Sequence, residues 1–284
     1  MRYIRQPGPV EPERHFVSLT DAVPIAIELK AGQIVLSALA EELNRLGAIS
    51  AYLSVQEANV RQLEFVMPAP SPDDDHTAWW SETYSLAGSA RIKEAGLVVG
   101  WRDGGPFIHC HGSWTDETGA QFAGHMLPDR CIIKDTATFT GWMFPDARFE
   151  GQFDPETNFT LFQPNGTAAK PDAHAALVRL RPNVEIGQEL GKICEKLGWA
   201  KAEVHGLGSL IGASFDNGDA MESYATEFLV RTGSINLEGP QSGADIDILI
   251  VGLDGEIMQG PLRKNDNAVL MTCELVLLRS EQSC

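Results

Sequence analysis

Three of the seven histidines in the chain, His109, His111 and His125, lie in the stretch from residue 107 to residue 127. His109 and His111 are separated by one residue in a segment rich in apolar and aromatic side chains, and on a strand this spacing places both imidazoles on one face. Imidazole is the commonest side-chain ligand of metals in proteins. The stretch therefore indicates a metal site, provided that His125 is brought back beside the first two.

The residues between the histidines favour a hairpin with the necessary register. The turn reads Thr-Asp-Glu-Thr-Gly, and its last residue, Gly119, suits a positive φ. A three-residue loop ending at Gly119 pairs Asp116 with Ala120 and places His111 opposite His125. A two-residue loop would turn the third ring to the other face of the hairpin. We predict the first register, with all three rings on one side.

Three imidazoles without a nearby thiolate pair suit zinc or another divalent transition metal, and they leave a fourth position open for water or a substrate. An ion held in this way lowers the pKa of a bound water or polarises a carbonyl oxygen. In the alternative interpretation, the three are partly exposed strand residues or hydrogen-bonded core residues. The pair on one strand with a third across a turn favours the metal.

The same residues resemble the PPC domain (plant and prokaryote conserved domain, formerly a domain of unknown function). The shared motif is His-x-His, then Asp-x-x-Gly, then Gly-His-Met-Leu, although the usual Gly-Gly-His stands here as Ala-Gly-His at residues 123–125. The resemblance implies a mixed, mostly antiparallel sheet flanked by helices, a trimeric assembly, and a metal, commonly zinc, on the three histidines. Plant members bind DNA through a separate Arg-Gly-Arg-Pro hook, which this chain lacks.

Charge weighs against a nucleic-acid partner. The chain has 39 acidic and 22 basic residues and a formal net charge of −17, whereas a protein that binds nucleic acid normally shows a basic footprint. No run approaches the roughly 18 apolar residues of a membrane span, and the first residues lack a signal-peptide core. Five cysteines without a Cys-x-x-Cys motif are typical of reduced packing residues. We expect a cytoplasmic protein without a membrane partner.

A weak internal repeat runs through the chain. Residues 29–47 align without a gap onto residues 180–198, and each segment predicts an amphipathic helix that ends at a glycine. The histidine stretch aligns with residues 244–262, in which the three histidines are replaced by Asp245, Asp247 and Pro261. Two carboxylates there either hold a hard cation or are solvated. The second copy has therefore lost the three-histidine site.

With 284 residues, the chain is long enough for two domains. We predict an α+β fold of two tandem PPC-like domains, each a mostly antiparallel mixed sheet flanked by helices. Residues 1–145 form the domain with the metal site, and residues 172–284 form a degenerate copy without the histidines. Residues 146–171 connect them, and four phenylalanines in this linker indicate that it packs on the surface of the domains.

An open metal site needs a group that transfers protons. Residues 82–88 align with residues 227–233, since each reads Glu, five residues, Gly-Ser. On this alignment Glu82 opens the strand before the histidine stretch, which makes it our candidate catalytic residue; otherwise it is a surface or structural carboxylate. Arg91 and Arg102 could hold an anionic substrate or be surface residues.

Our first hypothesis is a metal-binding, zinc-like protein that acts on or senses a small molecule at an open three-histidine site, and the sequence does not decide whether it is an enzyme. One alternative is a regulatory, DNA-associated PPC protein. Another is a structural oligomer in which the metal only stabilises the fold. The resemblance implies a homo-oligomer, a trimer, in each case.

Overall fold

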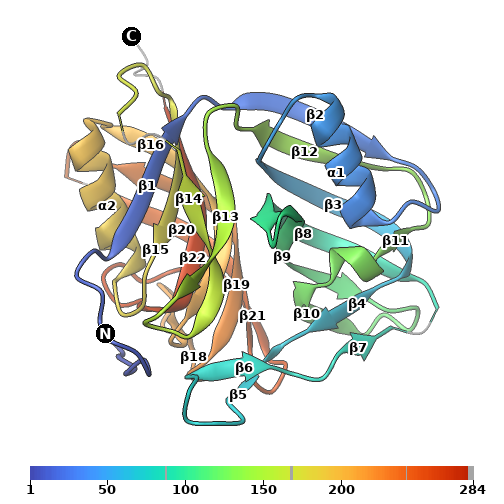
Figure 1. Cartoon of the computed structure of the whole chain (residues 1–284). Coiled ribbons are helices and arrows are strands. Elements are labelled where there is room, and N and C mark those ends of the chain that lie inside the picture. The colour runs from blue at the N-terminus through green and yellow to red at the C-terminus, as the bar shows by residue number, and fades with distance from the viewer. Residues whose placement is uncertain (87, 167–168, 241, 281–284) are drawn as a thin grey trace.

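The computed structural model describes residues 1–86, 88–166, 169–240 and 242–280, and it consists mostly of strands in two large sheets (Figure 1). Each sheet carries one α-helix, α1 (Val35–Arg45) on the first and α2 (Ile186–Leu197) on the second. The strands pair antiparallel, apart from a single parallel contact of β13 with β8. This is the α+β architecture that the sequence predicts. None of the helices in the described ranges is long and apolar enough to span a bilayer.

The first sheet has the strand order β2-β12-β3-β8-β9-β10-β4-β7, and three further strands attach to this path. Its helix α1 buries one apolar face, as the helical spacing predicts, and begins only at Val35 because Ile34 is held in an extended bridge with Ile132. The strands are β2 (Val23–Leu29), β3 (Ala51–Gln62), β4 (Glu64–Val66), β7 (Tyr84–Ser85), β8 (Ala90–Arg102), β9 (Gly105–Thr115), β10 (Gln121–Met126), β11 (Ile132–Ile133), β12 (Ala137–Met143), β13 (Arg148–Asp154) and β14 (Phe159–Asn165).

The second sheet has the order β1-β15-β22-β16-β19-β20-β21. Its outer strand β1 comes from the N-terminal segment, which we assigned to the first domain, but it pairs with β15 in the second sheet. Its strands are β1 (His15–Thr20), β15 (Ala175–Leu180), β16 (Lys201–Leu210), β19 (Thr226–Asn236), β20 (Gly243–Gly252), β21 (Ile257–Pro261) and β22 (Val269–Arg279). Outside both sheets lie β5 (Pro68–Pro70) with β6 (Ala78–Trp80), β17 (Ala213–Ser214) with β18 (Ala220–Met221), and a short 3-10 helix, η1 (Pro128–Arg130).

The two sheets share one order of strands. In the first, β2, β12, β3, β8, β9 and β10 are neighbours, and in the second, β15, β22, β16, β19, β20 and β21 are neighbours in the same sequence. In both sheets, the helix follows the first of these six strands along the chain. The strand that comes last in the sequence, β12 or β22, lies beside that first strand. The β9–β10 hairpin and the β20–β21 hairpin therefore occupy corresponding positions.

The two sheets face each other (Figure 1), and a layer of apolar side chains packs between them. The predicted linker contributes to it as the antiparallel hairpin β13–β14, whose Phe149 and Phe162 are buried between the sheets. Tyr52 and Val98 come from the first sheet, and Leu229 with others comes from the second. Burial of such side chains removes roughly 25 cal/mol of unfavourable hydration per Å² of apolar surface. The contact fixes β9 of the first sheet against β19 of the second.

Candidate metal centre

The three histidines lie on the β9–β10 hairpin, which we call the histidine hairpin, in the register that the sequence predicts. His111 is paired with His125. The Asp116 backbone N–H donates to the Ala120 carbonyl at 3.1 Å, and Gly119 has a φ of +86°. The Asp116 carboxylate closes the loop by accepting hydrogen bonds from backbone N–H groups of the turn. The three-residue loop therefore brings all the rings to one side.

A glycine beside the third histidine is required by packing. A Cβ on Gly124 would lie 2.4 Å from the Val66 carbonyl oxygen, and the φ of Gly124 is +154°. Strand β4 pairs with β10 at this point, with Val66 opposite His125. Glycine therefore allows β4 to approach closely enough to support the strand that carries His125.

The ligating atoms of His109, His111 and His125 all lie within 4.8 Å of one another. The Nε2 atoms of His109 and His111 are 3.0 Å apart. The ring of His125 lies 4.9 Å from that of His109 and 5.6 Å from that of His111, centroid to centroid. In the described parts of the chain, no other group of three or more metal-ligating side chains converges in this way.

The second sheet orients two of the rings. Glu274 on β22, which is 1% exposed, lies with its carboxylate 2.6 Å from His109 Nδ1. The carbonyl oxygen of Phe228 on β19 lies 2.9 Å from His111 Nδ1. Because a carbonyl oxygen only accepts, His111 must carry its proton on Nδ1, and the carboxylate favours the same for His109. The lone pairs of both Nε2 atoms then point into the space between the rings.

This donor set fits a zinc-like ion. Two lone pairs that face each other at 3.0 Å repel unless a cation binds both, and tetrahedral zinc with Zn–N bonds of 2.0–2.1 Å would bind two nitrogens about 3.4 Å apart. Burial, and then the charges of the neighbouring rings, hold the pKa of His111 well below its ordinary value. Burial, followed by the charges of His109 and Arg102, lowers the pKa of His125 likewise. Neutral imidazole is the form that binds metals.

The histidines open into a cavity of about 130 Å³ between the two sheets. Both halves of the chain line it, together with the β5–β6 and β13–β14 hairpins. Few charged groups face it, whereas its walls are rich in aromatic rings, namely those of Trp79, Trp80, Phe107, Phe159 and Phe162. A mostly apolar cavity with a few converging polar groups is typical of a small-molecule site.

Glu227 of β19 is the carboxyl group that the sequence analysis missed as a site residue. It lines the cavity, is 9% exposed, and accepts a hydrogen bond from the backbone N–H of His125. Its Oε2 atom has no hydrogen-bond partner among the described residues. Burial raises the pKa of Glu227 to about 8, against the opposing effect of that hydrogen bond. The signal available in the sequence was a glutamate directly before the apolar run Phe-Leu-Val, since a carboxyl group in such a segment is unusual.

Glu82 lies elsewhere. It is exposed, lies between β6 and β7, and is not among the residues that line the cavity. The expectation that Glu82 opens a strand is wrong, because the strand before the histidine hairpin begins at Ala90. The alignment of residues 82–88 with residues 227–233 does not follow the pairing of the strands. His111 pairs with Gly96 on β8, and its counterpart Asp247 pairs with Thr232 on β19, so Gly96 and not Gly88 lies at the level of this part of β19. Arg91 is an exposed residue paired with Glu57, whereas Arg102 lines the cavity.

The β20–β21 hairpin, which we call the aspartate hairpin, has the same register with different side chains. Asp247 pairs with Pro261, as His111 pairs with His125. The Asp247 carboxylate lies 3.1 Å from Arg231, and Lys264 lies 2.8 Å from Asp245. Basic side chains therefore neutralise these carboxylates.

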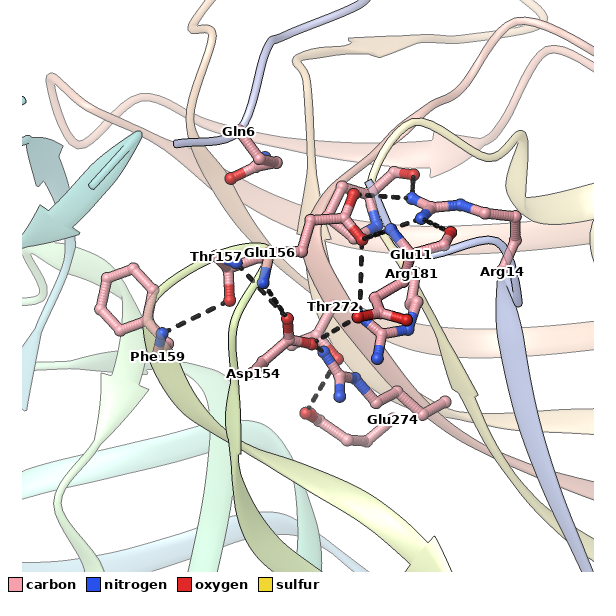
Figure 2. A network of polar contacts seen from close by, with 12 residues as sticks. Gln6, Glu11, Arg14, Asp154, Glu156, Thr157, Phe159, Arg181, Thr272 and Glu274 are labelled. Atoms are coloured by element: carbon pink, nitrogen blue, oxygen red, sulfur yellow. Dashed lines mark hydrogen bonds and ion pairs between the residues drawn. The ribbon is translucent and has the colours of Figure 1, made fainter. Parts of the chain in front are cut away.

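A buried network of charges lies behind Glu274 (Figure 2). Thr272 donates to the Glu274 carboxylate at 3.2 Å. Arg179, which is paired with Glu274 across β15 and β22, bonds to Asp154 of the linker. Arg181 bonds to the same carboxylate at 2.9 Å. The network continues through Glu156, 3.4 Å from Arg181, to Arg14 of the N-terminal arm. The arm, the linker and the second sheet thus hold the support of His109 in place.

Comparison with known proteins finds likeness at the level of structure. No family model and no curated protein sequence matches the chain. A metal-containing protein from Archaeoglobus fulgidus has 17% identity and a TM-score of 0.42, over 51% of this chain and 96% of that one. A protein from Bacteroides thetaiotaomicron that is proposed to bind DNA has 11% identity and a TM-score of 0.40, over 51% of this chain and 98% of that one.

A plant- and prokaryote-conserved (PPC) protein from Pyrococcus horikoshii has 17% identity and a TM-score of 0.39, and the match covers 56% of this chain and 100% of that one. Each of these three matches thus takes in nearly all of a solved structure and about half of this chain. A PPC protein is therefore among the structures to which this chain is similar, in agreement with the resemblance seen in the histidine motif.

Proposed function

We propose that the protein binds one zinc-like divalent ion through His109, His111 and His125 and acts on a small molecule in the adjoining cavity, with Glu227 as its acid–base group. The observation that carries this proposal is the position of the Glu227 carboxyl, buried in the cavity wall, bonded to the backbone of His125 and with one oxygen unpaired. A purely structural metal would not require such a group.

The side chains divide the work as follows. When bound, the ion supplies Lewis-acid polarisation of a ligand oxygen. Glu274 and the Phe228 carbonyl hold His109 and His111 by their Nδ1 atoms and keep both Nε2 atoms directed at the ion. Glu227 gives or accepts a proton at Oε2. The aromatic wall limits the access of water, which strengthens these electrostatic interactions.

We also propose that the two halves are copies of one domain, within residues 1–145 and 172–284 and joined by residues 146–171, with β1 of the first segment completing the sheet of the second half. The common strand order and the matching registers of the two hairpins support this. On this proposal the second copy has lost the metal ligands, and residues at other positions of its strands orient the histidines of the first copy. Homotrimeric assembly is implied only by the resemblance to PPC domains, and light scattering on the purified chain tests it.

Cobalt substitution tests the open site directly. The visible spectrum of Co²⁺ depends on its coordination, so azide should change the spectrum of the cobalt-loaded protein if a position is open to ligands. Glu227→Gln should keep the metal and alter the affinity for azide, because this carboxyl faces the cavity. Glu82→Gln, an exposed control that does not line the cavity, should leave both unchanged. A spectrum that azide does not change would show that protein side chains fill the coordination shell, and would refute the proposal.

A further inference from the structure

Arg102 at the end of β8 is the only basic side chain among the described residues that line the cavity, apart from the histidines. Its guanidinium lies 5.1 Å from the centre of the Phe107 ring. Arg102 forms one weak ion pair, with 3.5 Å between its Nε and the carboxylate of the exposed Asp103. Within the part of the chain that the structure describes, Arg102 donates no hydrogen bond. A guanidinium has five N–H donors in a planar fork. Arg102 therefore has unused capacity for a carboxylate.

The charge of the cavity favours an anion, although the chain as a whole is strongly acidic. Two carboxylates line the cavity, and each already accepts a hydrogen bond from a histidine: Glu274 from the His109 ring and Glu227 from the His125 backbone. A divalent ion together with Arg102 outweighs both carboxylates even when both are ionised. A cavity with walls of low dielectric concentrates this positive potential.

The size and the walls of the cavity favour a single ring. At about 130 Å³ it is close to the engineered apolar cavity of roughly 150 Å³ that takes up benzene. Phe107 and Phe162 meet at 81° with their centroids 5.6 Å apart, and the aromatic rings of the β5–β6 hairpin lie among the other lining groups. Such edge-to-face surroundings suit a planar aromatic ligand.

The spacing along β9 sets the positions of its polar ends. Phe107, His109 and His111 all line the cavity, as alternate residues on one face of a strand do. Each step of two residues is about 6.5–7 Å. The Arg102 guanidinium lies over the ring of Phe107, and Phe107 is one such step from His109. A ring with oxygens at opposite ends spans a similar distance.

From these observations we infer that the site takes a small aromatic carboxylic acid: its carboxylate pairs with Arg102, its ring lies against Phe107 and Phe162, and an oxygen at its other end faces the three histidines. This inference rests on the proposed function, since it names the ligand of the same site.

Calorimetric titration of the zinc-loaded protein with 4-hydroxybenzoate and with its neutral counterpart 4-hydroxybenzamide tests the inference. The acid should bind at least about tenfold more tightly, because hydrogen bonds to charged groups are stronger than those between neutral groups. Arg102→Gln should remove this preference and leave binding of the amide unchanged. Arg91→Gln, which removes an exposed arginine of the same strand, is the matched control and should behave as the unmodified protein.

Equal binding of the acid and the amide, or equal effects of the two arginine variants, would overturn the inference. Measuring zinc in every sample separates this result from failure of the proposed function. Full zinc content without a preference for the acid refutes the ligand class alone, whereas an unmodified protein that takes up no zinc refutes the metal site itself. Circular dichroism of the Arg102→Gln variant confirms that its sheets are intact.

Discussion

The histidine hairpin and the aspartate hairpin have the same backbone register and different chemistry. In the first, His111 lies opposite His125, and the rings meet carboxyl and carbonyl groups of the other sheet. In the second, Asp247 lies opposite Pro261 and pairs with Arg231. The backbone therefore does not determine whether such a hairpin can hold a metal; the side chains at the register positions and the groups that orient them do.

The comparison also shows how the two halves have come to differ in role. Glu227, Phe228 and Glu274 lie on strands of the second sheet and support the histidines of the first. The aspartate hairpin receives a different kind of contact in return, because Arg231 bridges Asp247 to Glu94 of the first sheet. One half carries the three histidines, and the other orients two of their rings.

The largest effect is expected from a ligand. His111→Ala should reduce metal content from about one ion per chain to a small fraction, because an open site with two remaining imidazoles binds zinc weakly. Asp245→Ala, at the position in the aspartate hairpin that corresponds to His109, should leave the content unchanged. Elemental analysis after dialysis measures both. If the two substitutions removed metal equally, or two ions per chain were found, the contrast between the hairpins would be refuted.

Next in size is the network behind Glu274. Asp154→Asn should lower the free energy of unfolding by about 3–5 kcal/mol, since it leaves two buried arginines, Arg179 and Arg181, without their shared carboxylate. Glu222→Gln, which removes an exposed partner of Arg2, should cost less than about 1 kcal/mol. Urea denaturation measures both, and similar costs would contradict the role assigned to the network.

The stability difference between the unmodified protein and Asp154→Asn should depend on pH. Burial on its own raises the pKa of Asp154, but the charges of Arg179 and Arg181 outweigh it, so its pKa in the folded protein lies below the ordinary value. The stability from ionised Asp154 is therefore fully present above its unfolded pKa of about 3.9 and is lost as the pH falls through the folded pKa. The difference between the unmodified protein and Asp154→Asn should be constant near neutrality and shrink only in acid.

A smaller effect is expected at the group that orients His109. Glu274→Gln should weaken zinc binding by about 10–100-fold without emptying the site, because partners of metal-ligating histidines typically contribute that much to affinity. Glu203→Gln, on β16 of the same sheet but exposed, serves as control. Competition with a chelator gives both affinities. Unchanged affinity in Glu274→Gln would show that the second half is not needed to orient the ligand.

The smallest effect belongs to the aspartate hairpin. Arg231→Gln removes a partly exposed bridge and should cost about 0.2–1 kcal/mol, with metal content unchanged. Thermal unfolding and elemental analysis report the two quantities. Uptake of a second ion by this variant would instead mean that Arg231 excludes a metal from Asp247, and would make the two hairpins more alike than the side chains indicate.

How much of this was predictable depends on distance along the chain. The register of the histidine hairpin follows from local turn chemistry, because Asp116 and Gly119 define the loop. The positions of α1 and α2 follow from apolar spacing. Glu274 and Glu227 could not be assigned, because they reach the histidines from strands more than a hundred residues away, and only the packing of the sheets brings them there.

The error over Glu82 has the same origin. Its alignment with Glu227 relies on Gly-Ser after five intervening residues, a pattern too short to be specific. Glu82 lies between β6 and β7, before β8 begins at Ala90, whereas Glu227 lies within β19, so the alignment does not match the strands. Likewise, β1 was placed with the strands that follow it in the sequence, whereas it completes the sheet of the second half.

Anomalous diffraction at the zinc edge from crystals grown with zinc tests the central claim most directly. We predict one strong peak per chain, about 2.0–2.1 Å from a nitrogen of each of His109, His111 and His125, with a non-protein fourth ligand on the side of Glu227. A peak whose fourth ligand is a protein side chain, a peak at Asp245 and Asp247, or no peak at the histidines would contradict the account.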